Sequence, residues 1–263
     1  MGRQLNVLIA CEESGAVRDA FRELGHNAWS CDLQPCDPAS KFSGYHLLGN
    51  AITAACQPWT FPSLPTVVMG PWWDLLIAHP PCTYLCNSGV RWLFRDTQPF
   101  VSSLTRSCNT RIATTMGMVT RKGKFTRPAN RTRVALMHDA GTLFRILYNQ
   151  SYIAHIAVEN PIMHSYGKHA CGVGKPSQVI QPWMFGHSEN KATCLWLKNL
   201  PKLTYDKQNA EFTKNMMVYL PKKMTNRIHY TSPGPERAKL RSKTYPGIAL
   251  AMATQWSDYI QSL

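Results

Sequence analysis

The stretch 5–32, LNVLIACEESGAVRDAFRELGHNAWSCD, indicates how this 263-residue chain folds. It opens with the nearly continuous apolar run 5–10, as expected for a strand that is buried on both faces. A helical pattern through Val17, Phe21 and Leu24 follows, and a second strand is expected over 27–31. Strand, helix and strand within about 30 residues make a β-α-β unit. We therefore predict an α/β fold with a mostly parallel central sheet and helices on both faces.

The rest of the chain continues this alternation. Further strands are expected over 45–48, 73–78, 155–158, 179–185 and 192–197, and helices over about 132–149 and 247–261. The stretch 99–128 is polar and basic, and we expect it to be a loop or insertion. Ligands of such sheets bind beyond the carboxyl ends of the strands. Several reactive or flexible residues fall at these ends, namely Glu13, Gly15, Asp32, Cys82 and Glu159.

The charge of the chain points to a polyanionic partner. There are 29 Lys and Arg against 15 Asp and Glu, for a net charge of +14. The positive charge is clustered, because no acidic residue lies between Asp96 and Asp139 and a second basic cluster runs over 202–243. One-signed surfaces of this kind contact phosphates, and their affinity for nucleic acid falls steeply with salt.

Other classes of protein fit less well. No apolar run approaches the ~20 residues of a membrane helix, and the N-terminus lacks the pattern of a secretory signal. We therefore expect a cytoplasmic protein that does not act at a membrane. The nine cysteines are scattered and odd in number, which favours reduced thiols. The pairs Cys31/Cys36 and Cys82/Cys86 have no regular partner pair downstream, so no metal site is expected.

Pro80-Pro81-Cys82 closes the buried strand 73–78 and suggests a nucleophile. Carbon 5 of cytosine becomes reactive toward a methyl sulfonium only after a nucleophile has added to carbon 6. A thiolate suits this step because it attacks strongly and also leaves readily. A turn with local N–H groups at the end of a strand lowers the pKa of such a thiol. Taken alone, Cys82 is equally well explained as an inert buried cysteine.

Glu159 strengthens the functional interpretation of Cys82. It follows the strand 155–158, within Val158-Glu159-Asn160-Pro161. An acid that protonates or hydrogen-bonds ring nitrogen N3 makes the addition to carbon 6 easier. The alternative is a solvated turn carboxylate or a helix cap. A cysteine and a glutamate at the ends of two parallel strands form a more specific pair than either residue alone.

Together, the run from Asp74 to Cys82 and the Glu159-Asn160-Pro161 motif resemble the cytosine-5 DNA methyltransferases, especially the short bacteriophage members. The resemblance implies a Rossmann-like S-adenosylmethionine-dependent methyltransferase fold. It also implies Cys82 as the nucleophile, Glu159 as the acid that grips the cytosine, S-adenosylmethionine as cofactor and DNA as partner. No obligate protein partner is implied, and the location would be the host cytoplasm if a phage encodes the chain.

The resemblance extends to the cofactor region with departures. Where the family has Phe-x-Gly-x-Gly after the first strand, this chain has Cys11-Glu12-Glu13-Ser14-Gly15. By resemblance, Asp32 binds the ribose hydroxyls, Asn50 replaces an aspartate that touches adenine, and Pro80 and Gly247 also line the cofactor. Lys191 takes the place of an arginine that contacts the cytosine O2, although Lys lacks the planar fork of Arg.

The same comparison suggests an arrangement of domains. We predict a catalytic core over 1–200, a small basic target-recognition segment over 201–243 and a helix over 244–263 that completes the core. Candidate phosphate contacts lie in the two basic clusters and beside Cys82, namely Arg91, Arg121, Lys122, Lys124, Arg127, Arg237 and Arg241. A recognition segment this short predicts a short target site or loose specificity.

Three alternatives stay open at the level of sequence. An amino-group methyltransferase has a comparable Pro-Pro motif but needs no thiol, so Cys82 and Glu159 argue against it. A tRNA cytosine-5 methyltransferase would share both catalytic motifs. A catalytically silent nucleic-acid binder is favoured if the atypical loop 11–15 and Asn50 abolish cofactor binding.

Overall fold

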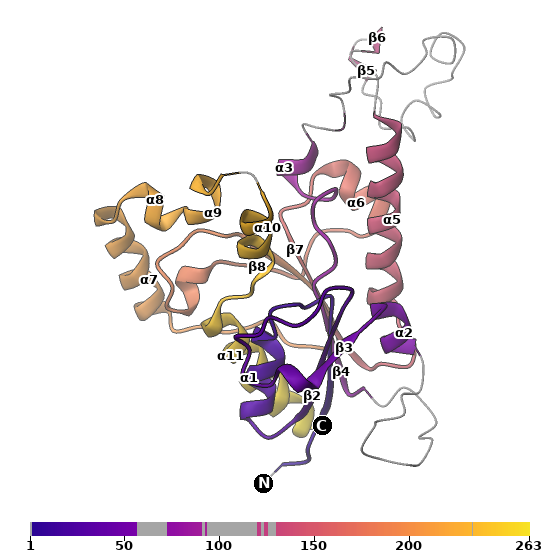
Figure 1. Cartoon of the computed structure of the whole chain (residues 1–263). Coiled ribbons are helices and arrows are strands. Elements are labelled where there is room, and N and C mark those ends of the chain that lie inside the picture. Colours follow the sequence, from indigo (N-terminus) through magenta and orange to yellow (C-terminus); the bar gives the residue numbers. More distant parts are fainter. Residues whose placement is uncertain are drawn as a thin grey trace. The chain divides into compact units, whose positions relative to one another are not determined.

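The computed structural model describes residues 2–56, 73–90, 93, 120–121, 124–125, 130–232 and 234–263. Figure 1 shows the course of the chain. Within the described part a seven-stranded sheet has the order β3-β2-β1-β4-β7-β9-β8. The strands of this sheet are β1 (Asn6–Ala10), β2 (Asn27–Asp32), β3 (His46–Leu48), β4 (Leu75–Ala78), β7 (His155–Pro161), β8 (Gln178–Ile180) and β9 (Thr193–Lys198). Along the sheet from β3 through β2, β1 and β4 to β7, each strand is parallel to the next. Strand β9 is antiparallel to both of its neighbours, β7 and β8. This order, with its single antiparallel strand, is typical of S-adenosylmethionine-dependent methyltransferases, and the predicted fold class is confirmed.

Helices cover both faces of the sheet. Those of the described residues are α1 (Ala16–Glu23), α2 (Ala51–Cys56), α3 (Asn87–Val90), α5 (Arg131–Tyr148), α6 (Ser165–Cys171), α7 (Lys207–Met216), α8 (Lys222–Thr225), α9 (Arg227–Tyr230), α10 (Pro235–Ser242) and α11 (Pro246–Gln261), with short 3-10 turns η1 (Ser43–Tyr45), η3 (Pro182–Phe185) and η4 (Met217–Tyr219). Val7 and Ile9 share a core with Phe21 of α1 and Trp256 of α11. Leu8 points to the opposite face, where α2 packs against β1.

Two predicted strands need correction. The strand expected over 179–185 ends at Ile180, and Pro182–Phe185 forms the 3-10 turn η3. Pro182 cannot donate to a sheet, and Gly186, with φ of 83°, ends the turn. The strand expected to end at residue 158 continues to Pro161, because β9 pairs with Glu159, Asn160 and Pro161. Glu159 therefore lies within a strand and not after it.

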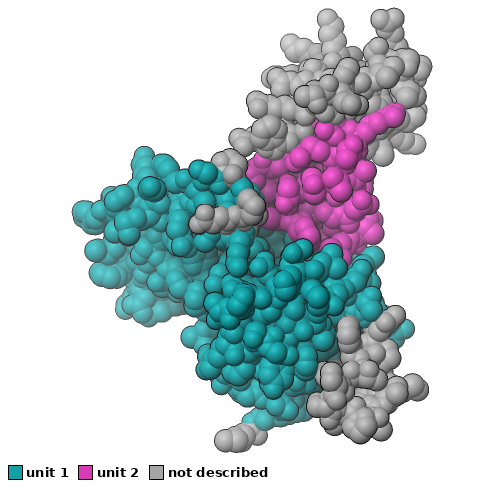
Figure 2. Space-filling model, viewed as in Figure 1, with its two compact units in different colours: residues 1–80, 146–161, 176–263 teal, residues 81–145, 162–175 magenta. Residues whose placement is uncertain are grey.

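The described chain divides into two compact units (Figure 2). Unit 1 comprises Met1–Pro80, Ile146–Pro161 and Pro176–Leu263, and holds the whole seven-stranded sheet. Unit 2 comprises Pro81–Arg145 and Ile162–Lys175. It includes an antiparallel pair, β5 (Thr120–Arg121) and β6 (Lys124–Phe125), which is the described part of the predicted insertion 99–128. The predicted segment 201–243 falls in unit 1 as α7 to α10, and its role in recognition stays a prediction.

Candidate active site

The loop after β1 begins and ends with left-handed backbone. Cys11 has φ of 59°, which is uncommon for a residue with a side chain and costs on the order of 1–3 kcal/mol. Gly15 has φ of 68° and is the N-cap of α1. A Cβ at Gly15 would collide with the guanidinium of Arg18. A glycine is therefore required at this position, and the single glycine of the loop stands where the backbone needs it.

Glu12, which we predicted to bind cofactor, hydrogen-bonds to the first turn of helix α1. Its side chain is buried, Oε1 accepts the Val17 N–H at 2.8 Å and Oε2 accepts the Arg18 N–H at 3.3 Å. Burial raises the pKa of Glu12, and the charge of His79 and the two hydrogen bonds oppose this effect. Glu12 thus caps α1 with both oxygens and brings a carboxylate close to His79.

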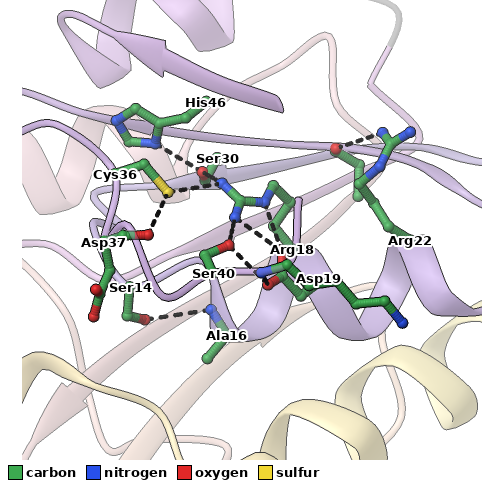
Figure 3. Close-up of polar contacts among 12 residues, drawn as sticks. Ser14, Ala16, Arg18, Asp19, Arg22, Ser30, Cys36, Asp37, Ser40 and His46 are labelled. Carbon is green, nitrogen blue, oxygen red and sulfur yellow. Dashed lines mark hydrogen bonds and ion pairs between the residues drawn. The ribbon is translucent and has the colours of Figure 1, made fainter. Parts of the chain in front are cut away.

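Arg18 joins the loop after β2 to α1, as Figure 3 shows. Its side chain is fully buried, and Nη1 donates to Ser30 Oγ at 2.6 Å and to Cys36 Sγ at 3.4 Å. Nη2 donates to Ser40 Oγ and forms an ion pair with Asp19 at 2.8 Å. Sequence reasoning missed Arg18. The sequence signal that could have identified it is the position of a charged residue next to Val17, on the face of α1 that is buried.

Asp32 and Asn50, the two predicted ligands of the cofactor's ribose and adenine, lie at or just after the ends of the neighbouring strands β2 and β3. Asp32 ends β2, and its Oδ1 accepts the Gln34 N–H at 2.9 Å. Burial, with a smaller contribution from the charge of Asp32, raises the pKa of Cys11 to about 12. Asn50 Oδ1 accepts the Ile52 N–H at 2.8 Å at the start of α2. Both side chains make local turns or caps, so their contact with a cofactor stays a prediction.

Glu159 is the centre of a polar group within unit 1. Its side chain is 15% exposed, and Oε2 lies 3.4 Å from Nδ1 of His79, whose side chain is 7% exposed. Burial alone would raise the pKa of Glu159. The hydrogen bond and charge of His79, the charge of Lys191 and a hydrogen bond from Thr193 outweigh burial and lower it. Glu159 is therefore an ionised carboxylate surrounded by donors and positive charge.

Lys191 precedes β9, and its charge lowers the pKa of Glu159; its contact with a cytosine stays a prediction. Nζ donates to the Lys243 carbonyl at 2.9 Å and lies 5.7 Å from the centre of the Tyr245 ring. The backbone N–H donates to Gln181 Oε1 at 3.0 Å, and the backbone carbonyl accepts the Thr193 hydroxyl at 3.2 Å. These bonds attach the segment before α11 to the loop that carries Lys191.

Two buried polar atoms near Glu159 have no hydrogen-bond partner among the described residues. They are Nε2 of His79 and Oδ1 of Asn160. Asn160 is fully buried and donates from Nδ2 to the Pro161 carbonyl at 2.8 Å. Buried polar groups are rarely left unpaired unless a ligand, water or reaction uses them. Sequence reasoning missed His79, although it lies one residue before Pro80 at a strand end.

Pro80 and Cys82 follow β4 on either side of the boundary between the units. Pro80 is buried and ends the first segment of unit 1, whereas Cys82 is half-buried and belongs to unit 2. The Cys82 carbonyl accepts the N–H groups of Leu85 and Cys86, both at 3.0 Å. Cys82 thus stands at the start of a tight turn, and none of the eight described cysteines is in a disulfide.

Backbone contacts within unit 2 fix the turn after Cys82. Asn87 N–H donates to the Ile162 carbonyl at 3.1 Å, and His164 N–H donates to the Leu85 carbonyl at 3.1 Å. A Cβ at Gly89 would collide with the Thr83 carbonyl, and one at Gly167 would collide with the Leu85 carbonyl. The turn therefore depends on close backbone approach at two glycines.

The predicted phosphate contacts are only partly described. Arg91, Lys122 and Arg127 lie outside the described residues, and only the backbone of Arg121 and Lys124 is described. Arg237 and Arg241 lie on α10. Their neighbour Lys239 forms ion pairs with Glu13 at 3.6 Å and Asp37 at 3.5 Å. Helix α10 is therefore attached by charge to the loops after β1 and β2.

Gly247, predicted to allow close approach of the cofactor, lies in the first turn of α11. Its N–H donates to Nε2 of His187 at 2.9 Å, and a Cβ there would collide with the Phe185 carbonyl. The close approach is made by the chain itself, and the role of Gly247 toward a cofactor stays a prediction. Among the described residues, no three or more His, Cys, Asp or Glu side chains are grouped so that they could hold a metal ion. Nor do these residues include a helix with the length and apolarity needed to cross a membrane.

A scan against protein-family models and a search of curated proteins each found no match. Three solved structures are similar to this chain. A DNMT2 mutant from Spodoptera frugiperda is 14% identical over 78% of this chain and 54% of that one, with a TM-score of 0.31. A putative DNA modification methyltransferase encoded within prophage Cp of E. coli is 11% identical over 88% of this chain and 56% of that one, with a TM-score of 0.36. The Dnmt2 methyltransferase of S. pombe is 14% identical over 88% of this chain and 61% of that one, with a TM-score of 0.35. The chain thus spans between 54% and 61% of the length of these structures. Identities and TM-scores of this size carry no information on substrate or activity.

Proposed function

We propose that this chain is an S-adenosylmethionine-dependent DNA cytosine-5 methyltransferase, with Cys82 as nucleophile and Glu159 as the acid. The observation that carries the proposal is the group around Glu159. A carboxylate beside His79, Lys191 and Thr193 suits the Watson–Crick edge of cytosine, which presents an amino donor, an N3 acceptor and an O2 acceptor. Glu159 would take the amino group and N3, and Lys191 would take O2.

Cys82 is close to His79 of this group along the chain. Cys82 follows His79 by three residues, which span at most about 11 Å when fully extended. His79 is anchored in turn, because its N–H donates to the Ala10 carbonyl at 2.9 Å. The proposal requires that one cytosine meet both the thiol of Cys82 and the carboxylate of Glu159.

The residues beyond β1 and β2 fit the cofactor that this fold implies. Asp32 is partly exposed at the end of β2, where a carboxylate suits ribose hydroxyls, and its charge reaches Cys11 after β1. Asp32 would hold the ribose, Asn50 would donate its amide to the adenine, and the loop 11–15 would hold the methionine end. When bound, S-adenosylmethionine supplies an electrophilic methyl group.

The reaction requires a cytosine that is flipped out of the duplex, because carbon 6 is inaccessible in the stack. The Cys82 thiolate forms an S–C6 bond while Glu159 gives a proton to N3, which makes carbon 5 an enamine-like nucleophile. After carbon 5 has been methylated, a base removes the carbon 5 proton. The S–C6 bond then breaks, N3 loses its proton, and Cys82 leaves as the thiolate.

The segment 201–243 suits the nucleic acid. It carries exposed lysines and exposed apolar or aromatic side chains, among them Lys207, Lys214, Lys222, Lys223, Phe212, Val218, Tyr219 and Tyr230. Lysines bind phosphates without regard to sequence, and aromatic rings stack on bases. A surface of this composition favours binding of a nucleic acid over a small substrate.

Nucleoside mass spectrometry after incubation with S-adenosylmethionine tests the proposal. We expect 5-methylcytosine in duplex DNA, its loss in Cys82→Ala, and a reduction in Glu159→Gln. DNA with 5-fluorocytosine should form a covalent adduct with the wild type, because fluorine cannot leave carbon 5 as a proton does. Methylation by Cys82→Ala, or methyl groups on nitrogen only, would overturn the mechanism. Competition with tRNA separates the two substrates, and preferential methylation of tRNA would transfer the same chemistry to RNA.

A further inference from the structure

His79 lies between two carboxylates on three neighbouring strands. It follows β4, Glu12 follows β1 and Glu159 is part of β7, and the sheet order places β4 between β1 and β7. Nδ1 lies 3.4 Å from Glu159 Oε2, and the charge of His79 acts on Glu12 as well. Lys191, just before β9, and Thr193, the first residue of β9, both lower the pKa of Glu159. The charge of Arg18 in α1 opposes the rise in the pKa of Glu12 that burial causes.

The imidazole of His79 is more buried than a solvent-facing histidine and is not fully paired. Its side chain is 7% exposed, and Nε2 has no hydrogen-bond partner in the described part of the chain. A buried nitrogen without a partner costs about 1–3 kcal/mol. A histidine that served only for packing would not need to keep this nitrogen, since an apolar residue fills space at lower cost.

The proposed reaction needs a proton at Glu159 at the moment of addition. The neighbours of Glu159 lower its pKa, so the carboxylate is ionised near neutral pH and has no proton to give. Among the groups that act on Glu159, histidine is the type of side chain that carries an exchangeable proton near pH 7. An ordinary lysine ammonium keeps its proton at this pH, and a threonine hydroxyl is not acidic.

We propose that His79 is a positioning residue that stores the proton which Glu159 delivers to N3 of the cytosine; this inference rests on the proposed function. As Cys82 adds to carbon 6, the Nδ1 proton of His79 moves to Oε2 of Glu159, and the carboxyl group gives a proton to N3. His79 enters this step with a proton on each ring nitrogen and leaves it neutral, with the remaining proton on Nε2. When N3 loses its proton at the end of the cycle, the proton returns through Glu159 to Nδ1, so the balance closes without a further reagent.

The distance between His79 and Glu159 agrees with this role. At 3.4 Å it exceeds the 2.7–3.2 Å of an ordinary N–H···O hydrogen bond. Hydrogen bonds of catalytic groups are often long without substrate and shorten in the reacting complex. The long contact lets Glu159 turn toward the base and return to His79.

The experiment compares single-turnover methylation by the wild type and by His79→Asn. The asparagine amide nitrogen takes roughly the place of Nδ1 and preserves a hydrogen bond to Glu159, but it stores no titratable proton. We expect the rate to fall about 100-fold. The ratio of wild-type to variant rate should decline as the pH rises, because an imidazole gives up its stored proton at high pH and an amide has none to lose. Because ionisation of Cys82 affects both proteins, it cancels in this ratio.

His26→Asn is the matched control. His26 is also buried, at 6% exposure, and its Nδ1 accepts the Leu5 N–H at 3.3 Å before β2, at the opposite end of the strands. This variant should lose stability but keep a constant ratio to the wild type at every pH. An equal rate for His79→Asn and wild type, or a pH-independent ratio, would overturn the proposal.

A second measurement separates this proposal from the function on which it rests. Nitrogen NMR of the imidazole reports whether Nδ1 of His79 carries a proton, and it needs no methyl transfer. We expect protons on both ring nitrogens of His79 at neutral pH, and an Nδ1 signal that changes in Glu159→Gln. A histidine with only one protonated ring nitrogen would contradict the stored proton even in an active methyltransferase. Absence of methylation of any DNA or RNA by the wild type, with a protonated Nδ1, would instead contradict the proposed function and leave the His79–Glu159 pair supported.

Discussion

Arg18 donates from Nη1 to Ser30 Oγ at 2.6 Å, although the Arg18 side chain is fully buried. The same guanidinium holds Ser40 and pairs with Asp19, so one cation joins α1, β2 and the loop that follows β2 (Figure 3). A charge that is buried this completely is stable only with its partners in place. The geometry of the candidate cofactor loops therefore depends on a residue that has no catalytic role in the proposed reaction.

Arg18→Met should lower the free energy of unfolding by about 3–5 kcal/mol, because Asp19 and the serine hydroxyls lose their partner. Urea denaturation measures this loss. Arg3→Met is the control, since Arg3 pairs with Asp74 but is 61% exposed, and a change below about 1 kcal/mol is expected. Equal losses in the two variants would contradict the account of Arg18.

Gly15→Ala should destabilise the protein and weaken binding of S-adenosylmethionine. Its φ of 68° is strained for alanine, and the added Cβ meets the Arg18 guanidinium. Gly25→Ala is the matched control, with φ of 84° and no atom within 4 Å of the added Cβ. Each should lose about 1 kcal/mol or more of stability, but titration calorimetry should find weaker cofactor binding in Gly15→Ala alone. Unchanged binding in Gly15→Ala would remove the loop 11–15 from the cofactor site.

Replacement of Lys222 and Lys223 by alanine should weaken binding of DNA of any sequence. Both lysines are exposed in α8, and each phosphate contact that is lost lowers the slope of log affinity against log salt by about 1. Fluorescence anisotropy at several salt concentrations measures the slope. Lys41→Ala serves as the control, because Lys41 is 64% exposed but paired with Glu23, and it should keep the wild-type slope. The same slope in the double variant would exclude α8 from the interface.

Acidification should loosen the start of α11 through His187. Burial lowers the pKa of His187 from its ordinary 6.5, although the charge of Glu189 opposes this. The unfolded chain therefore takes up the proton first, so the stability contributed by neutral His187 is present above pH 6.5 and is lost as the pH falls toward its folded-state value. Protonation of Nε2 also removes the acceptor of the Gly247 N–H.

His187→Gln tests this pH dependence, since a glutamine oxygen accepts the Gly247 N–H without titrating. The free energy of unfolding should fall less steeply between about pH 7 and pH 5 in the variant than in the wild type. His187→Ala, which lacks an acceptor at any pH, should be less stable than His187→Gln near neutral pH. A steeper fall in His187→Gln than in the wild type would reverse the sign of the argument.

Much of the fold could be predicted from local patterns. The β-α-β unit 5–32, the strand before Pro80 and the final helix appear within one to two residues of their predicted bounds, because each carries a strong periodic signal between turn residues. The prediction of a strand over 179–185 was wrong for its second half, because the chain forms a 3-10 turn from Pro182 onward. The extension of β7 through Glu159 depends on pairing with β9, which is distant in sequence and therefore left no local signal.

The candidate site divides in the same way. Local sequence was enough to propose Cys82, Glu159 and Asp32, because a reactive side chain at or near the carboxyl end of a buried parallel strand is expected at the binding edge of the sheet. Only the tertiary structure brought His79 to Glu159 and Arg18 to Ser30 and Ser40. Such contacts join residues that are 12 to 80 positions apart and depend on strand order and helix packing, which no local pattern encodes.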